Sequence, residues 1–581
     1  MENNIYSSKK RLLSLLMTAI FLFVLLTGRL AFVQIIQGKN LTARALDQWT
    51  RDVPITPQRG DILDCRGRVV ATSYTTYSVY IRAKNVTEPE RVAQVLSDIT
   101  GKSYETVYRK ACNRGVSEST VCRQLSAEKA TELRDYRLNG VYLAPDCSRF
   151  YPYGDLLTQV LGFVSVDNVG QTGLEKQYNT YLAGTPGRIL TQTDLIGVEL
   201  EEEPFYYLPA VNGLQIQLTI DATIQKMTES VLETIAYTHT PKAARAIVME
   251  ADTGAILAMA SKPSFDLNHL PRDDVASLME YSRNALLTDV YEPGSTFKVL
   301  TAAADLEEYA CGNPKAFSPQ HIFSDAGYRV VDGRKINCWT KHVNGKHAHE
   351  NLAMALNNSC NPVFTDIALS LGKETFYKYL DLFGYGKRTG IDFAGEQAGL
   401  LVPKNSVKNG DLARIGFGQT IAVTPIQLVS ATAAAVNGGR LMTPYLVRSV
   451  TTQDGTLVRR FEPQMRNRAV SEETSRTLAL MLEDVVTKGS GKQAYIEGYR
   501  VGGKTGTAQK YENGVIAQGK YVSSFVGFFP ANQPKYVALV VVDEPTGPHY
   551  GSTVAAPYAK TIFEGIIRYE NIPPMANDEK R

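Results

Sequence analysis

The chain of 581 residues lacks the motifs of several common protein classes. Its seven cysteines include no Cys-x-x-Cys pair, and an odd number excludes complete internal pairing, so a disulfide framework or a zinc ribbon is not expected. No His-Glu-x-x-His motif is present. The net charge is only +3, which gives a nucleic-acid partner no electrostatic support. A chain of this length exceeds what one core holds, so we expect two or more folded units.

A metal site has a single candidate region in the sequence. Three histidines follow Cys338 closely, at His342, His347 and His349. Their spacing fits no standard zinc pattern, and histidines are common in polar loops. We therefore predict no metal site.

A second long apolar run is also missing, which leaves one candidate for a membrane helix. Residues 12–28 are apolar apart from three hydroxyl side chains, and the run resumes after Arg29. As a helix the first stretch spans about 25 Å, and the continuation brings the length to roughly 33 Å, enough to cross a bilayer. We therefore assign residues 12–35 to a membrane anchor.

The flanking residues predict the orientation of this anchor. The basic run Lys9–Arg11 stands immediately before it, which places a short tail, residues 1–11, in the cytoplasm. The alternative is a cleaved signal peptide. We disfavour it because the run is long and the nearest Ala-x-Ala, at residues 43–45, lies well past its end.

The region from about residue 39 to residue 207 contains no catalytic set. Residues 54–64 have the pattern of short strands broken by turn residues, and residues 103–138 have that of mixed, charged helices. The acidic run at 201–204 indicates a loop or linker before the next domain. We interpret this region as a structural or docking module.

A new pattern begins at Leu214. Residues 214–220 alternate between apolar and polar, as in a half-buried strand, and Asp221 is placed to cap the helix that follows. Five further segments have strand patterns: 245–250 and 255–260, which form a hairpin, and 501–508, 522–529 and 536–542. Two early and three late strands around a mostly helical middle predict an α+β domain built on one antiparallel five-stranded sheet.

Three short motifs occur in one order across this region. They are Ser295-Thr296-Phe297-Lys298, Ser359-Cys360-Asn361 and Lys504-Thr505-Gly506-Thr507. Each is weak alone, because Ser-x-x-Lys occurs four times in the chain, although Lys-[Ser/Thr]-Gly occurs only at Lys504. Only the Ser295 copy follows a Pro-Gly turn and opens an alanine-rich helical stretch. Together the three motifs supply the groups for acyl transfer through a serine ester.

The first motif supplies a nucleophile and a base. Residues three apart share a helix face, so we expect Lys298 to reach toward the Ser295 hydroxyl. A serine hydroxyl is a poor nucleophile until a base takes its proton. Lys298 acts as that base if burial and the nearby charge of Lys504 lower its pKa. The N-terminus of the helix favours the developing oxyanion.

The second motif adds a proton relay. We expect Ser359 and Asn361 to project into the same cleft from the loop after a helical stretch. Ser359 then passes a proton to the leaving amine, while Asn361 holds the Lys298 amine and the substrate amide.

The third motif adds a carboxylate site. The predicted sheet order brings Lys504 beside the helix that begins near Ser295. Lys504, with the Thr505 and Thr507 hydroxyls, is expected to bind a substrate carboxylate. Gly506, and Gly503 before it, are expected to leave room for a substrate backbone along the strand.

These motifs resemble the signature of penicillin-binding proteins and class A β-lactamases. With the anchor and the long first region, the chain is similar to a class B, monofunctional penicillin-binding protein. Arg59–Asp64 resembles the opening motif of that family's pedestal, although Cys65-Arg66-Gly67 stands where members have Arg-Asn-Gly, and Gly173–Tyr178 resembles a later pedestal motif. Ser359–Pro362 and the ending around Tyr550 are more similar to the division and spore-septum branch.

The resemblance implies a reaction and a domain plan. Ser295 attacks the D-Ala-D-Ala terminus of a stem peptide and releases the last D-alanine, and an amine of a neighbouring stem resolves the acyl-enzyme into a cross-link. The oxyanion lies on the backbone N–H groups of Ser295 and Thr507. The implied plan is a pedestal or dimerisation domain at 39–207, a transpeptidase domain at 213–570 and a polar tail at 571–581.

The resemblance also implies partners and a location. Peptidoglycan stem peptides and β-lactam antibiotics bind the site, and no metal or organic cofactor is required. A membrane glycan polymerase and division-complex proteins are the expected protein partners. The expected location is the bacterial cell membrane, with a single pass and the catalytic domain outside.

Several alternatives remain open at this stage. A D,D-carboxypeptidase or a β-lactamase uses water as the acceptor, although a β-lactamase needs neither an anchor nor a pedestal. A penicillin sensor needs a cytoplasmic effector, which residues 1–11 are too short to form. An idle scaffold of the division complex is disfavoured by the intact serine, lysines and asparagine.

Overall fold

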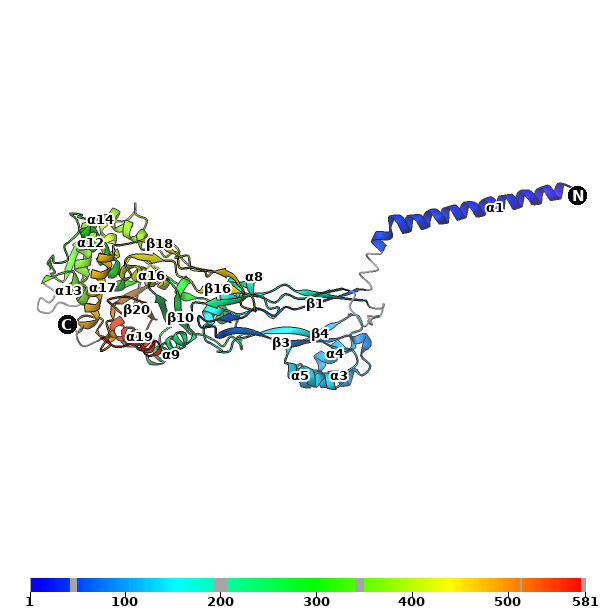
Figure 1. The fold of residues 1–581 in the computed structure, drawn as a ribbon, viewed down its shortest axis with the longest axis horizontal. Coiled ribbons are helices and arrows are strands. Elements are labelled where there is room, and N and C mark those ends of the chain that lie inside the picture. The colour runs from blue at the N-terminus through cyan, green and yellow to red at the C-terminus, as the bar shows by residue number, and fades with distance from the viewer. Residues whose placement is uncertain (1, 42–49, 193–205, 340–348, 513–514, 576–581) are drawn as a thin grey trace. The chain divides into compact units, whose positions relative to one another are not determined.

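The structure is a computed structural model that describes residues 2–41, 50–192, 206–339, 349–512 and 515–575 (Figure 1). By its internal contacts the chain forms two compact units. One comprises residues 1–57 and 185–212, and the other comprises residues 58–184 and 213–581.

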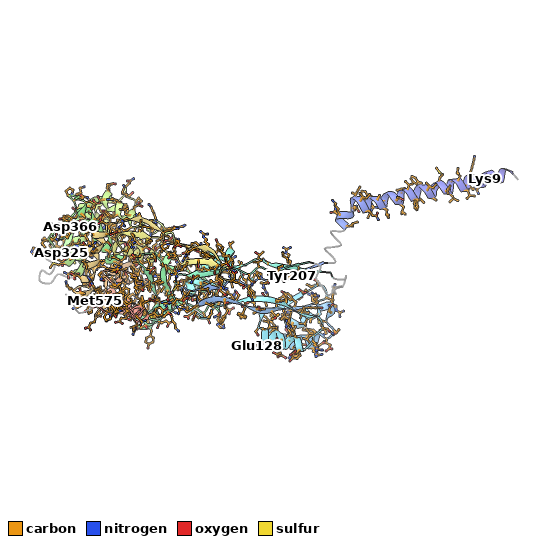
Figure 2. The ribbon with its side chains drawn as sticks, viewed as in Figure 1. Lys9, Glu128, Tyr207, Asp325, Asp366 and Met575 are labelled. Carbon is orange, nitrogen blue, oxygen red and sulfur yellow. The ribbon has the colours of Figure 1, made fainter. Side chains whose placement is uncertain are left out.

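The first unit contains the apolar helix and a small sheet. Helix α1 (Glu2–Ala31) continues into the π-helical turn η1 (Phe32–Ile36), and its side chains from Lys9 onward are not covered by other described residues (Figure 2). It is long and apolar enough to cross a membrane, as predicted. Three antiparallel strands follow, in the order β1 (Thr50–Ile55), β6 (Gly187–Gln192) and β7 (Tyr206–Leu208).

The second unit begins with a seven-stranded sheet. Its strands are β2 (Ile62–Leu63), β3 (Val69–Ile81), β4 (Ser119–Leu125), β5 (Val141–Phe150), β8 (Gln215–Leu218), β16 (Val447–Thr451) and β17 (Leu457–Arg460). The order is β17-β16-β8-β2-β3-β4, and β5 also pairs with β3. The predicted strand at 214–220 is thus confirmed as β8, and it joins strands that lie far before and far after it in the chain.

A small helical lobe packs beside β3 and β4 (Figure 1). Its helices are α3 (Pro89–Thr100), α4 (Tyr104–Cys112) and α5 (Ala127–Asp135), after the 3₁₀ turn η2 (Ala83–Asn85). Val92, Leu96, Val107 and Leu133 form its own apolar core. The prediction of mixed, charged helices over 103–138 was wrong over 119–125. That segment pairs with β3 and is strand β4, because tertiary pairing overrides local propensity.

Short helices and the start of the catalytic part follow. They are α6 (Thr158–Leu161), α7 (Gly173–Gln177), α8 (Asn179–Leu182), α9 (Ala222–His239), α10 (Val275–Ser282) and α11 (Ala285–Thr288). Asp221 caps α9 as predicted, because its Oδ1 accepts the Thr223 N–H at 2.8 Å.

The predicted five-stranded antiparallel sheet is confirmed. Its order is β10-β9-β21-β20-β19. The strands are β9 (Ala243–Glu250), β10 (Ile256–Lys262), β19 (Gly502–Glu512), β20 (Val515–Phe529) and β21 (Tyr536–Asp543). β19 is an edge strand of this sheet, so half of its backbone groups face away from β20.

Helices cover both faces of the sheet. On one face α9 and α19 (Ala556–Tyr569) enclose an apolar core that includes Leu232, Val540 and Phe563. On the other face lie α16 (Pro425–Val436) and a helical subdomain. The remaining elements of the catalytic part are η3 (Gly294–Phe297), α12 (Lys298–Ala310), α13 (Leu352–Asn358), α14 (Asn361–Leu382), α15 (Asn409–Ile415), α17 (Glu472–Thr487), η4 (Lys492–Ala494), α18 (Gly551–Val554), β11 (Phe323–Ser324), β12 (Tyr328–Val331), β13 (Arg334–Asn337), β14 (His349–Glu350), β15 (Arg440–Met442) and β18 (Met465–Arg468).

Candidate active site

Ser295 lies in a turn whose backbone packs closely against Gly418. It belongs to the 3₁₀ turn η3, and the α-helix begins only at Lys298. Gly294, at φ +55°, donates its N–H to the Gly418 carbonyl at 2.9 Å. A Cβ at Gly418 would lie 2.0 Å from the Gly294 oxygen. Glycine is therefore required at Gly418, and the turn holds Ser295 partly exposed at the edge of a cleft.

Lys298 is fully buried behind Ser295. Its Nζ donates to the Ser359 carbonyl at 2.6 Å, to Asn361 Oδ1 at 2.8 Å and to Ser359 Oγ at 3.1 Å. Burial lowers the pKa of Lys298 to about 8. The expected contact with Asn361 is present. The expected reach toward the Ser295 hydroxyl is not, since Lys298 makes no hydrogen bond to Ser295 among the described residues.

Ser359 lies between two lysines. Lys504 Nζ donates to Ser359 Oγ at 3.0 Å, the same oxygen that Lys298 contacts at 3.1 Å. The Ser359 backbone ends α13 in the left-handed region, at φ 56° and ψ 44°, which is uncommon for a residue with a Cβ. Lys504 is also fully buried, and its pKa is lowered well below the usual lysine range by burial and by the charge of Lys298. The structure thus joins all three motifs at one hydroxyl.

β19 presents the third motif along the cleft. Thr505, Gly506 and Thr507 line the cleft together with Ser295, and Thr507 Oγ1 accepts the Gly551 N–H of α18 at 3.0 Å. The expectation that Gly503 and Gly506 leave room for substrate needs a correction.

The chain itself fills the space beside both glycines. A Cβ at Gly506 would lie 2.7 Å from Ser524 Oγ and 2.8 Å from the Pro293 oxygen. One at Gly503 would lie 2.5 Å from the Phe525 ring. These glycines let the strand pack against the turn that contains Ser295 and against β20. Gly506 still lines the cleft through its backbone.

Sequence reasoning missed an aromatic rim on the cleft, which has a volume of about 360 Å³. The rings of Tyr521 and His549 stack with their centroids 4.0 Å apart. The ring centroids of Tyr550 and Trp339 lie 6.3 Å apart. Trp339 donates its indole N–H to the Asn358 carbonyl at 2.8 Å. The sequence signals were faint: Trp339 is one of two tryptophans, and Tyr550 belongs to a segment noted above only for its branch resemblance.

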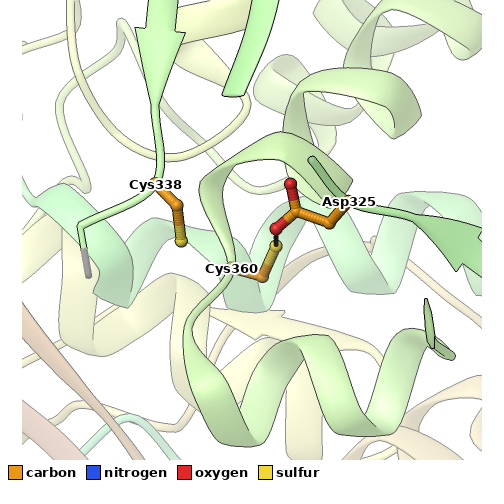
Figure 3. Close-up of side chains that lie close together, drawn as sticks. All are labelled: Asp325, Cys338 and Cys360. Carbon is orange, nitrogen blue, oxygen red and sulfur yellow. Dashed lines mark hydrogen bonds between the residues drawn. The ribbon is translucent and has the colours of Figure 1, made fainter. Parts of the chain in front are cut away.

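A cluster of two thiols and one carboxylate includes Cys360, the middle residue of the second motif (Figure 3). The donor atoms of Asp325, Cys338 and Cys360 all lie within 4.8 Å of one another. Cys360 donates its S–H to Asp325 Oδ2 at 3.1 Å, and the neighbouring Cys338 and burial raise the pKa of Cys360. A thiol held protonated is a poor metal ligand, and Cys360 is fully buried, as expected of a small packing residue.

One of the three histidines near Cys338 is described by the structure, and it takes no part in this cluster. His349 lies in β14 and is not a member of the group, while His342 and His347 lie outside the described residues. The carboxylate of the cluster comes instead from Asp325, for which the sequence had no signal.

Comparison with known proteins places these features in context. Residues 244–564 match the "Penicillin binding protein transpeptidase domain" and residues 54–218 the "Penicillin-binding Protein dimerisation domain". Stage V sporulation protein D of Bacillus subtilis is 38% identical over 98% of this chain and 87% of its own length. Peptidoglycan D,D-transpeptidase FtsI of Escherichia coli K12 is 28% identical over 95% of this chain and 90% of its own length. The solved structure of a peptidoglycan synthetase from Bifidobacterium adolescentis has the same fold, with a TM-score of 0.73 and 24% sequence identity. The match covers 91% of this chain and 98% of that one.

Proposed function

The chain belongs to the penicillin-binding protein transpeptidases, and from that premise we propose that Ser295 is its nucleophile and Lys298 the base. It is a serine-type peptidoglycan D,D-transpeptidase of septal cell-wall synthesis with one helix that crosses the membrane. The single observation that carries the assignment of residues is the position of Ser359 Oγ, 3.1 Å from Lys298 Nζ and 3.0 Å from Lys504 Nζ.

Lys298 is suited to accept the Ser295 proton. A neutral amine has two N–H donors and one lone pair. In the neutral amine the Ser359 carbonyl and Asn361 Oδ1, at 2.6 and 2.8 Å, take up both donors. The lone pair then replaces the third N–H, which the charged amine donates to Ser359 Oγ at 3.1 Å. Because burial lowers the pKa of Lys298 to about 8, a fraction of the Lys298 side chains is uncharged near pH 7 and can accept a proton. As Ser295 Oγ bonds to the carbonyl carbon, its proton passes to this lone pair.

Ser359 links the base to the leaving group. When the C–N bond breaks, the amine of the terminal D-alanine needs a proton. The Ser359 hydroxyl gives its own proton to that amine and takes one from Lys298, which returns the base to its neutral form.

The edge strand β19 holds the substrate. Lys504 and the Thr505 and Thr507 hydroxyls bind the terminal carboxylate, and this negative charge offsets the burial that lowers the pKa of Lys504, so the amine is charged when substrate is bound. The backbone N–H groups of Ser295 and Thr507 stabilise the oxyanion. Gly506 contributes its backbone to the same wall.

The remaining assignments concern the whole chain. Residues 1–11 are the cytoplasmic tail, since Lys9–Arg11 stands at the start of the apolar segment. The proposed pedestal spans 39–207 and the proposed transpeptidase domain 213–570. The family matches at 54–218 and 244–564 support two domains in this order, although the first match runs past 207. A membrane glycan polymerase and division-complex proteins are the proposed partners.

Intact mass of the full chain in detergent, incubated with benzylpenicillin and followed over hours, tests this proposal. We expect one stable adduct on the wild type and none on Ser295→Ala. A synthetic D-Ala-D-Ala donor with an acceptor amine should yield the cross-linked peptide and free D-alanine. An adduct on Ser295→Ala contradicts the proposed nucleophile. Hydrolysis without cross-linking makes the protein a carboxypeptidase.

A further inference from the structure

One aromatic ring in the wall of the catalytic cleft is held in a fixed orientation although it remains largely exposed. Trp339 lines the cleft and is 53% exposed. Its indole N–H donates to the Asn358 carbonyl at 2.8 Å. Its ring makes an edge contact with Tyr550, with the centroids 6.3 Å apart and the planes at 63°. The ring is thus oriented by two contacts and still offers surface to a ligand in the cleft.

The segment that carries Trp339 lies against the second motif. Asn361 donates its side-chain N–H to the Asn337 carbonyl at 3.2 Å. Asn358, which accepts the indole N–H, directly precedes Ser359. In the proposed mechanism Ser359 gives the leaving amine its proton. Cross-linking forms an amide in place of the one that was broken, so the acceptor amine enters where the leaving amine departed and gives its proton to the same hydroxyl. Trp339 therefore borders the place where the acceptor arrives.

The charge of the cleft decides which group can attract an acceptor. An alkyl amine has a pKa of about 10.4, so it arrives as an ammonium ion. No aspartate or glutamate is among the described residues that line the cleft, and two buried lysines contact Ser359. The face of an indole ring attracts a cation without carrying a charge of its own. Trp339 is thus suited to hold an ammonium group where the described wall offers no carboxylate.

We propose that Trp339 determines acceptor specificity by binding, on its exposed indole surface, an acceptor whose primary ammonium group ends an aliphatic chain. This step rests on the proposed function. The bound ammonium gives one proton to water, and the neutral amine attacks the carbonyl carbon of the Ser295 ester. A C–N bond forms and the C–O bond breaks. A further amine proton passes through Ser359 to Lys298, and Lys298 returns a proton to Ser295 Oγ.

Partition of one acyl-enzyme between an amine and water tests this proposal. N-benzoyl-D-alanyl-thioglycolate acylates the full chain in detergent, the burst of released thiol measures acylation, and the ratio of amide to acid product measures transfer. The acceptor probe is Nα-acetyl-lysine amide, whose single charge is a primary ammonium on an aliphatic chain. For Trp339→Leu we expect half-maximal amide formation to need about tenfold more acceptor, with an unchanged thiol burst. Trp339→Phe restores an aromatic face and should need only about threefold more than the wild type.

Matched ligands and a matched variant separate cation binding from side-chain bulk. Nα-acetyl-Nε-trimethyllysine amide has the charge but cannot react. It should suppress amide formation by the wild type, and the uncharged Nα-acetylnorleucine amide should not. Tyr521→Leu removes an aromatic ring that lines the same cleft from β20, where it pairs with Gln509, and should keep the acceptor dependence of the wild type.

Three results would overturn the proposal: the same acceptor dependence in Trp339→Leu as in the wild type, an equal shift in Tyr521→Leu, or no amide product from this acceptor. A wild type that forms no Ser295 adduct with penicillin and releases no thiol from the thioester contradicts the proposed function instead.

Discussion

Two regions of the second unit bury charged side chains in opposite ways. In the pedestal, Glu175 lies between two arginines: Arg59 Nε donates to its Oε2 at 2.5 Å and Arg149 Nε to its Oε1 at 2.7 Å. In the catalytic part, Lys298 and Lys504 are buried against one serine hydroxyl, and neither is hydrogen-bonded to a carboxylate of the described residues.

The difference follows from the chemistry of the two cations. Arginine keeps its proton in proteins, so a buried guanidinium needs a carboxylate and several acceptors. Arg59 has them, since it also donates to the Asn168 and Glu175 carbonyls and to Asn179 Oδ1. Lysine can give up its proton. Burial without a carboxylate partner therefore lowers its pKa and lets the neutral amine act as a base. In the pedestal, buried charge thus serves structure, whereas in the proposed active site it serves reactivity.

The largest expected effect comes from replacing Lys298, the proposed base, by an arginine. Lys298→Arg keeps a cation but removes a group that can accept a proton near neutral pH, so we expect penicillin acylation to slow by about 10²–10⁴-fold. Stopped-flow or intact-mass kinetics measure the rate, with circular dichroism as the check on folding. A folded variant that acylates at the wild-type rate would show that Lys298 is not the base.

Removing the pedestal carboxylate should cost stability instead of reactivity. Glu175→Gln leaves two buried guanidinium groups without a negative partner, and we expect the free energy of unfolding to fall by roughly 3–5 kcal/mol. Denaturant unfolding measures the change. The folded fraction should still acylate Ser295, and unchanged stability would mean that the two arginines find other partners.

The pH dependence of acylation distinguishes the two kinds of buried charge. With the pKa of Lys298 at about 8, half of it is neutral at pH 8 and about 1% at pH 6, so we expect the rate to fall about fiftyfold over that interval. Lys298 binds its proton less tightly in the folded than in the unfolded chain, so its contribution to stability rises with pH between about 8 and 10.5. A flat rate profile from pH 6 to 8 would refute the assignment.

The smallest effect is expected from a matched change in the pedestal. Arg149→Met leaves Glu175 paired with Arg59 as a neutral ion pair, so the loss is limited to the hydrogen bonds of Arg149, roughly 1–3 kcal/mol. Its unfolding free energy should lie between those of the wild type and Glu175→Gln. A larger loss than in Glu175→Gln would contradict the view that charge balance controls this core.

Features that depend on near neighbours in the chain were predictable. The alternation at 214–220 gives β8, the hairpin turn joins β9 and β10, and Asp221 caps α9. The strand at 119–125 was missed because its pairing with β3, not its own pattern, decides its state. The requirement for glycine at Gly506 was visible, but its reason, the close approach of Pro293, was not.

By itself the sequence determined the membrane-length helix, the strand and helix pattern, and the three motifs whose residues stand within a few positions of one another. Only the tertiary structure decided that Ser359 Oγ contacts two lysines from distant segments. It also decided that Cys360 donates a hydrogen bond to Asp325 and that Arg59 forms an ion pair with Glu175. Local periodicity acts over one or two turns, whereas burial, and with it the pKa of Lys298, depends on which distant segments fold over a side chain.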